Sequence, residues 1–152
     1  MKAQQNSLGF LLADVSRLMR HAFRQRLEGS SLTPSQARAL IYVSRNEGIR
    51  QVELADMLEI QPISLARLID QLEAARLVER HADPADRRAY QLFLTPAAAT
   101  QIAAIEQVAK AIRVDALAGI DKRQAEALLD TLNTMRANLA ALPRAHAGEK
   151  SE

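Results

Sequence analysis

The apolar positions of residues 51–72 recur at three- and four-residue steps, the spacing that puts side chains on one face of an α-helix. Residues 51–58 predict a short helix, and residues 59–61 predict a tight turn. A second helix is predicted to begin at Pro62, a position where the missing N–H of proline breaks no hydrogen bond. Its apolar face is formed by Leu65, Leu68, Ile69 and Leu72. The segment is therefore predicted to be a helix-turn-helix.

The residues after this segment alternate between apolar and polar, which predicts a β-hairpin. Residues 77–80 and 90–94 are expected to pair around a charged tip at residues 83–88. Along the second strand, the side chains expected to point inward are those of Tyr90, Leu92 and Leu94, and those expected to point outward are Gln91 and Phe93. Ile49 and Arg50 could add a third short strand. Two helices followed by a hairpin are typical of a winged helix-turn-helix, which places one helix in a DNA groove and a loop beside it.

Longer helices are predicted on both sides of this module. The first spans about residues 7–28, and its apolar stripe is wide enough that we expect burial on two sides. Thr33-Pro34 and Thr95-Pro96 each combine a capping hydroxyl with a proline, which predicts helix starts there. A final helix is predicted from Asp121 until Pro143. The fold class is therefore mainly α with a small β-hairpin wing.

The flanking helices have no obvious partner of sufficient size within the chain. Their leucine and isoleucine rows would lose about 25 cal/mol per Å² if left in water. Homodimerisation would cover them and supply the two-fold symmetry of DNA half-sites, although antiparallel packing within one chain is an alternative. The expected parts are an N-terminal dimerisation helix (1–32), the winged helix-turn-helix (33–94), C-terminal dimerisation helices (95–143) and a flexible tail (144–152).

Composition narrows the classes of function. The 152 residues include 48% hydrophobic and 3% aromatic residues, which favours a helical core of aliphatic side chains. Cysteine is absent, so disulfides and thiol-based sensing are excluded. The formal charge of +2 permits nucleic-acid binding without arguing for it. No apolar run has the length needed to cross a bilayer and the N-terminus lacks a signal-peptide pattern, so we expect a cytoplasmic protein without a membrane partner.

The polar face of the helix from Pro62 is the first candidate DNA-binding surface. It carries Gln61, Ser64, Arg67 and Gln71, whose donors and acceptors can reach base edges. Arg67 can pair with a guanine or a phosphate, and the first turn offers free amides to phosphate. The alternative is an ordinary solvated face, which most amphipathic helices have.

The hairpin tip adds a second candidate surface, formed by Asp86, Arg87 and Arg88. Adjacent guanidiniums repel each other, and Asp86 is expected to bridge to Arg88 and hold its side chain extended. An extended arginine on a narrow protrusion suits a minor groove with strong negative potential. The alternative is a solvated turn with an ion pair worth about 0–1 kcal/mol.

Together these segments resemble the MarR/SlyA family of transcription regulators. The matching stretches are Leu54-Ala55, residues 68–73, residues 77–80 and residues 83–88 before Leu94-Thr95. The resemblance implies a homodimer that binds pseudo-palindromic operators in double-stranded DNA, usually as a repressor. It also implies that Gln61, Pro62, Ser64 and Arg67 belong to the recognition helix, with Arg88 as the wing arginine and Asp86 as its brace.

Two positions depart from the family pattern. Arg76 stands where a glycine usually separates the recognition helix from the wing, and a side chain with a Cβ tolerates a left-handed turn poorly. The sequence therefore does not decide between a tight left-handed turn at Arg76 and a longer or differently angled exit from the helix that begins at Pro62. Ala98 or Ala99 replaces another common glycine, which should be harmless because alanine favours helices.

Many members of this family release DNA when a small aromatic or amphipathic compound binds near the dimerisation helices. The candidate ligand residues here are Arg17, Arg20, His21 and Tyr42, because an anion site needs a fixed cation beside apolar walls. The alternative is that the arginines only solvate the first helix and that His21 is an ordinary interfacial side chain.

An enzyme is not supported, because the chain has no glycine-rich phosphate loop, nucleophile elbow or metal-ligand spacing. No cofactor is expected. A winged-helix module that binds a protein is a more serious alternative. Arg87 and Arg88 favour DNA, because a protein-binding wing would gain from apolar residues at its tip.

Overall fold

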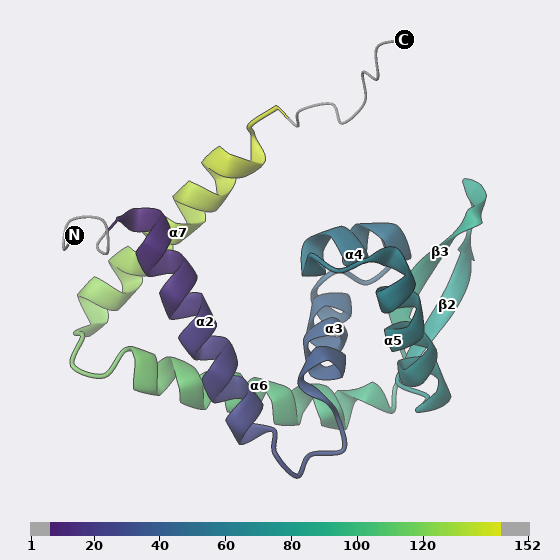
Figure 1. Cartoon of the computed structure of the whole chain (residues 1–152), viewed down its shortest axis with the longest axis horizontal. Helices are drawn as coiled ribbons and strands as arrows, with labels where there is room; N and C mark the ends of the chain where they lie inside the picture. The colour runs from purple at the N-terminus through teal and green to yellow at the C-terminus, as the bar shows by residue number, and fades with distance from the viewer. Residues whose placement is uncertain (1–6, 144–152) are drawn as a thin grey trace. The chain divides into compact units, whose positions relative to one another are not determined.

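The computed structural model describes residues 7–143. The chain divides into two compact units, one ending at Val114 and the other beginning at Asp115. The first unit contains the winged module, whose ribbon is shown in Figure 1. The elements in chain order are α2 Leu8–Arg26, α3 Pro34–Arg45, β1 Ile49–Arg50, α4 Gln51–Leu58, α5 Pro62–Ala74, β2 Val78–Asp83, β3 Asp86–Leu94, α6 Ala98–Ala116 and α7 Lys122–Ala140.

Two of the predicted helix starts, at Thr33 and Asp121, are confirmed by individual hydrogen bonds, whereas the Thr95 hydroxyl donates to the Arg76 carbonyl at 2.6 Å and α6 begins only at Ala98. Thr33 accepts from the Gln36 N–H at 3.2 Å, and the Gln36 side chain accepts from the Thr33 N–H at 3.0 Å, forming a capping box. Asp121 likewise accepts from the Gln124 N–H at 2.8 Å before α7. These short-range signals place α3 and α7 where the sequence predicts them.

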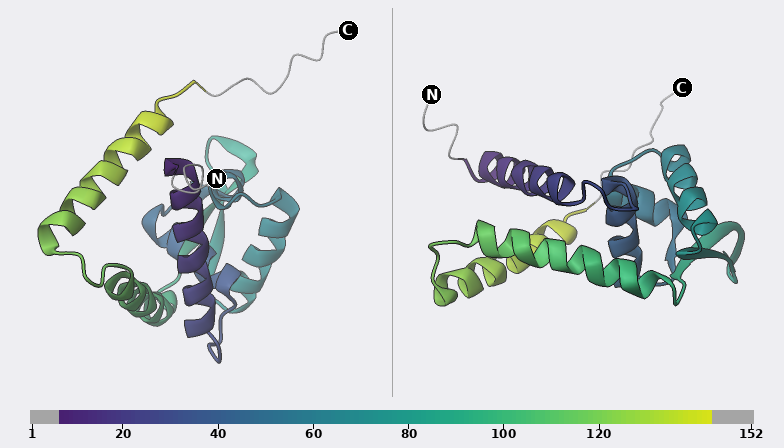
Figure 2. Two further views of the ribbon diagram at one scale, coloured as in Figure 1. Left: turned by 60° about the vertical axis from the view of Figure 1, so that its left-hand side comes forward. Right: turned by 90° about the horizontal axis from the view of Figure 1, so that it is seen from below.

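The sheet is antiparallel with the strand order β1-β3-β2, so the predicted third strand is present. The hairpin is longer than predicted, because pairing continues to Asp83 and Asp86 around a two-residue turn. Figures 1 and 2 show its tip protruding from the helices of the module. Leu92 points inward as expected and is fully buried, whereas Tyr90 does not and is 49% exposed. That prediction for Tyr90 is wrong because β3 begins at the tip, and Tyr90 lies on the part of the strand that the core does not reach.

The core of the winged module is aliphatic and joins all of its elements. The largest fully buried side chains are Leu40, Val43, Leu54, Leu65, Ile69, Leu72, Val78 and Leu92. They come from α3, α4, α5 and the hairpin, and Leu68 packs partly buried against the same cluster. The predicted apolar face of α5 is therefore confirmed, and its burial leaves the opposite face of the helix exposed.

The exit from α5 corrects the expectation about Arg76. Arg76 takes the left-handed conformation with φ of 58°, so the tight turn forms without glycine. The Leu77 N–H donates to Leu72 O at 2.9 Å and the Arg76 N–H donates to Glu73 O at 2.9 Å, which is a Schellman motif. Burial of Leu72 and Leu77 on either side fixes the turn. The left-handed residue costs about 1–2 kcal/mol, which these interactions offset.

The long flanking helices are as predicted in position, and α6 begins at Ala98 without a glycine. In the single chain, no described residue of α2 or α7 is buried. The expected burial of α2 on two sides therefore does not occur within one chain. No helix in the described range 7–143 is long and apolar enough to cross a membrane.

Candidate nucleic-acid interface

The outward face of α5 carries polar side chains that are open to solvent. Gln61, Ser64 and Arg67 are exposed, and no hydrogen bond or ion pair within residues 7–143 occupies their side chains. Pro62 occupies the first turn, and the Gln61 side chain does not cap the helix. The N–H groups of the first turn can therefore donate to a phosphate, whose charge suits the positive end of the helix dipole.

Gln71 differs from the rest of the predicted row. Its side-chain oxygen accepts from Gln36 Nε2 at 2.9 Å, which links α5 to the first turn of α3. The Gln71 amide can still donate to DNA, but part of its hydrogen-bonding capacity is used within the protein.

Arg80 of β2 connects the hairpin to both helices of the helix-turn-helix. Its guanidinium donates to Asp70 Oδ1 at 2.6 Å, to the Ala66 carbonyl at 3.0 Å and to Gln51 Oε1 at 2.9 Å. Glu73 adds an ion pair at 3.5 Å, and its other oxygen accepts from the Arg80 N–H at 3.2 Å. The Arg80 side chain is 16% exposed, so these contacts form a largely desolvated cross-link. The wing and α5 are therefore held at a fixed angle.

A second cross-link holds the base of the wing tip. Arg50 Nε donates to Asp83 Oδ2 at 2.6 Å, and the Ala85 N–H donates to Asp83 Oδ1 at 2.8 Å. The hydrogen bond from Ala85 and the charge of Arg50 hold the pKa of Asp83 below its ordinary value of 3.8, although burial of the carboxyl opposes this. Asp83 is consequently ionised at neutral pH and fixes the turn that precedes the two arginines.

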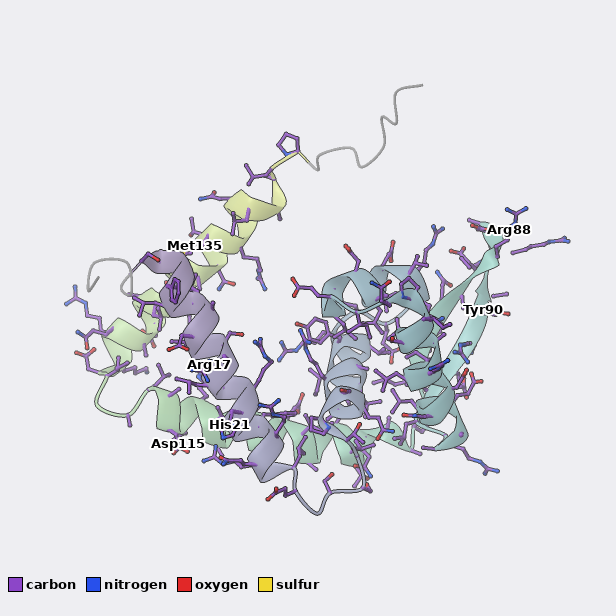
Figure 3. All side chains as sticks on the ribbon, in the orientation of Figure 1. Arg17, His21, Arg88, Tyr90, Asp115 and Met135 are labelled. Carbon is purple, nitrogen blue, oxygen red and sulfur yellow. The ribbon has the colours of Figure 1, made fainter. Side chains whose placement is uncertain are left out.

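The wing tip itself differs from the prediction in one respect. Asp86 accepts from the backbone N–H of Arg88 at 2.9 Å, and within the described range no ion pair joins the two side chains. The expected brace on the guanidinium is wrong, because the carboxylate closes on the nearer backbone donor. Arg87 and Arg88 are both exposed, and Figure 3 shows Arg88 at the end of the hairpin, away from the helices.

The candidate ligand residues are on two helices, with Arg17, Arg20 and His21 on α2 and Tyr42 on α3. Arg17 donates to Asp14 Oδ1 at 2.6 Å, and Arg20 donates to Ser16 Oγ at 2.7 Å, so both pair within α2. His21 is exposed on the same helix (Figure 3). Tyr42 instead lies under the Arg38 guanidinium, 5.6 Å from the ring centre. No described hydrogen bond or ring contact joins Tyr42 to the other three residues.

Sequence reasoning missed the roles of Arg50, Arg80 and Asp83. The chain did offer one signal, because Asp70 and Glu73 stand on the polar side of α5 and Arg80 follows in the next element. Opposite charges on consecutive elements are common, however, and their separation in sequence does not predict a contact.

Comparison with known proteins agrees with this geometry. The sequence model of the MarR family matches residues 30–89, which span the turn before α3 through the wing tip. A solved structure of a transcriptional regulator is 36% identical, covers 90% of this chain and 100% of its own, and has a TM-score of 0.72. The chain belongs to the MarR family.

Other solved MarR regulators have the same fold at lower identity. A MarR-family regulator from Silicibacter pomeroyi is 26% identical with a TM-score of 0.77, and covers 95% of this chain and 94% of its own. A MarR regulator from Methanosarcina mazei Go1 is 26% identical with a TM-score of 0.76, and covers 86% and 94%. As a MarR-family transcriptional regulator, this protein is a DNA-binding protein and belongs to a non-enzymatic family.

Proposed function

We propose that this MarR regulator is a homodimeric repressor that binds pseudo-palindromic operators. In this proposal α5 enters the major groove and presents Gln61, Ser64, Arg67 and the free amide of Gln71 to the bases. Arg88 enters the adjacent minor groove, Arg87 contacts phosphate, and Pro62 and Asp86 shape the two contacting backbones. The two α5 helices of a dimer would lie one turn of B-form DNA apart, about 34–36 Å.

The observation that carries the proposal is that Arg80 fixes the hairpin to α5, and that each of these two parts carries an unpaired, exposed arginine. Arg67 and Arg88 are exposed and have no protein partner in residues 7–143, while Arg80 joins α5, which carries Arg67, to β2, whose partner strand β3 carries Arg88. Two cations held at a set spacing match a regular array of phosphates and grooves. An exposed polar face without such a connection would not set that spacing.

Exposed apolar side chains support the dimer. On α2, Leu8 is 62% exposed and Leu18 is 52% exposed; on α7, Leu139 is 64% exposed. Burying such leucines in a second copy would stabilise the pair by about 1.5–3 kcal/mol for each side chain fully covered. We therefore propose residues 1–32 and 95–143 as the dimerisation regions, with residues 33–94 as the DNA-binding part. The proposed tail, residues 144–152, lies outside the described residues.

We also propose that a small amphipathic or aromatic acid releases the repressor from DNA. Arg17 and Arg20 provide cationic groups on a helix whose apolar side chains are exposed. Arg20 donates to the neutral Ser16 hydroxyl and Arg17 forms an ion pair with Asp14, and each guanidinium keeps further N–H donors for a carboxylate. His21 and Tyr42 complete the proposed set of ligand residues.

The direct test is selection of bound sequences from random duplex DNA, followed by titration of the selected site at several salt concentrations. The expected result is a two-fold symmetric site whose affinity falls steeply with salt, because phosphate contacts release counterions. Binding of a monomer, or equal retention of every sequence, would contradict a homodimeric operator-binding repressor. A reporter placed behind the selected site then distinguishes repression from activation.

A further inference from the structure

The second residue of α5 is an exposed isoleucine on a surface that is otherwise polar. Ile63 is 66% exposed, which makes it the most exposed large hydrophobic side chain among the described residues. It follows Pro62 and precedes Ser64, so it lies in the first turn of the helix. The inward side chains Leu65, Ile69 and Leu72 are buried in the core, so Ile63 contributes nothing to the apolar face of α5.

Single apolar side chains are common on protein surfaces, so exposure alone has no functional meaning. The position of Ile63 is more informative. Ile63 and Arg67 are four residues apart, which places them next to each other along one strip of α5. When a helix of this kind enters the major groove, its N-terminal residues contact the base edges. Ile63 therefore belongs to the surface that is proposed to face the bases.

We propose that Ile63 contacts the C5-methyl group of a thymine and makes this regulator select a thymine at one position of each half-site. The inference rests on the proposed binding of α5 in the major groove. The thymine methyl is the apolar group that base pairs present in that groove, whereas the other positions offer donors and acceptors. The branched side chain of Ile63 has restricted χ1 freedom in a helix, so little conformational entropy is lost on contact.

The spacing along α5 also places this thymine relative to the base read by Arg67. Four residues of helix rise about 6 Å, close to two base steps of about 3.4 Å each. We therefore expect the thymine within about two base pairs of the guanine that Arg67 contacts. Both specificities come from one strip of the helix, Ile63 through an apolar contact and Arg67 through hydrogen bonds.

Replacement of thymine by deoxyuridine tests the contact directly, because this exchange removes only the methyl group. The full-length protein is titrated against its selected operator, with each thymine of one half-site replaced in turn by deoxyuridine. One position is expected to weaken binding about fourfold, corresponding to the ~0.8 kcal/mol of one buried methyl group. The same measurement with Ile63→Ala is expected to show no difference between thymine and deoxyuridine at that position.

Matched variants separate this contact from general effects. Ile63→Val keeps a branched apolar side chain and is expected to retain most of the preference for thymine. Val52→Ala changes a side chain that is 63% exposed on α4 and is expected to leave the deoxyuridine profile unchanged. Circular dichroism should show the same melting transition for all variants, because none of the altered side chains is buried.

The outcomes separate this inference from the proposed function. If the operator is bound but no thymine is sensitive to loss of its methyl group, the assignment to Ile63 is wrong and the repressor proposal stands. Uniform weakening by Ile63→Ala, with the wild-type deoxyuridine profile retained, would show a backbone contact and would also overturn the assignment. Failure to bind any duplex DNA would overturn both proposals.

Discussion

Arg80 Nη1 lies 2.6 Å from Asp70 Oδ1, and this contact joins β2, the first strand of the hairpin, to α5. The two residues differ sharply in environment, because the Arg80 side chain is 16% exposed and that of Asp70 is 65% exposed. Loss of its hydrogen-bond partners is therefore expected to cost more free energy at the desolvated Arg80 than at the solvated Asp70. This asymmetry leads to a first prediction about stability.

Arg80→Leu is expected to lower the free energy of unfolding by about 2 kcal/mol, because it leaves the Ala66 carbonyl and Gln51 without their charged donor. Asp70→Asn should cost only about 0–1 kcal/mol, since the carboxylate is solvated. Urea denaturation measures both, with the exposed Arg88→Leu as a control expected to be within about 0.5 kcal/mol of wild type. Equal losses for Arg80→Leu and Arg88→Leu would show that the cross-link contributes no stability.

Arg88→Ala is expected to weaken operator binding and to reduce the slope of log affinity against log salt by about 1, as expected for one lost phosphate or groove contact. Sedimentation should show the same oligomer as wild type. Arg123→Ala removes an exposed arginine on α7 and serves as the matched control with unchanged affinity. If the two variants bind equally well, the wing does not contact DNA.

Arg67→Ala is expected to cost about 1–3 kcal/mol of operator binding and to relax the preference for a base at one position in each half-site. The reason is that Arg67 has no partner in the described protein and can form a bidentate contact with guanine. Affinities for a set of single-base operator variants provide the measurement. A loss of the same size for every variant would assign Arg67 to a phosphate instead.

Leu139→Asp is expected to split the homodimer, because it replaces an apolar side chain that is 64% exposed in the single chain with a charged one. Asn138→Asp adds the same charge at the preceding exposed position and should leave the dimer intact. Analytical ultracentrifugation over a range of concentrations measures both. A Leu139→Asp protein that remains dimeric would place the interface on other residues.

Asp83 predicts a dependence of stability on pH. Because its pKa is lowered in the folded state, its contribution is complete at neutral pH and is lost as the pH falls below 3.8 and through the folded-state pKa. The difference in unfolding free energy between wild type and Asp83→Asn should therefore be constant near neutral pH and shrink in acid. Asp86→Asn, at the exposed tip, is the control. A difference that persists unchanged in strong acid would contradict an ionised Asp83.

Much of the fold could be predicted because its signals are local. The Thr33 capping box, the Asp121 cap and the spacing of Leu65 and Ile69 involve residues at most four apart, and all appear as expected. Tyr90 was expected to point inward because the alternation of a strand does not show where the core beneath it ends. The point along β3 at which the core ends depends on tertiary packing.

The candidate site was predicted only in part. The exposure of Ser64, Arg67 and Arg88 follows from helix and hairpin patterns. Charge pairing was less predictable: Asp86 was expected to hold the Arg88 side chain but accepts from its backbone, which is the closer donor. The partners of Arg80 are 7 to 29 residues away, and sequence alone does not specify that distance in space.

The Schellman turn at Arg76 makes the end of α5 a position where a single substitution changes stability through opposing effects. Its φ of 58° is one that glycine adopts freely, so Arg76→Gly should relieve backbone strain in the folded state. The same substitution should raise the conformational entropy of the unfolded chain, which favours unfolding. The two effects oppose each other, and the arginine additionally places a positive charge beside the C-terminal end of the helix dipole. A positively charged side chain therefore stands at the junction between α5 and the wing, and salt is expected to screen its interaction with the end of the helix.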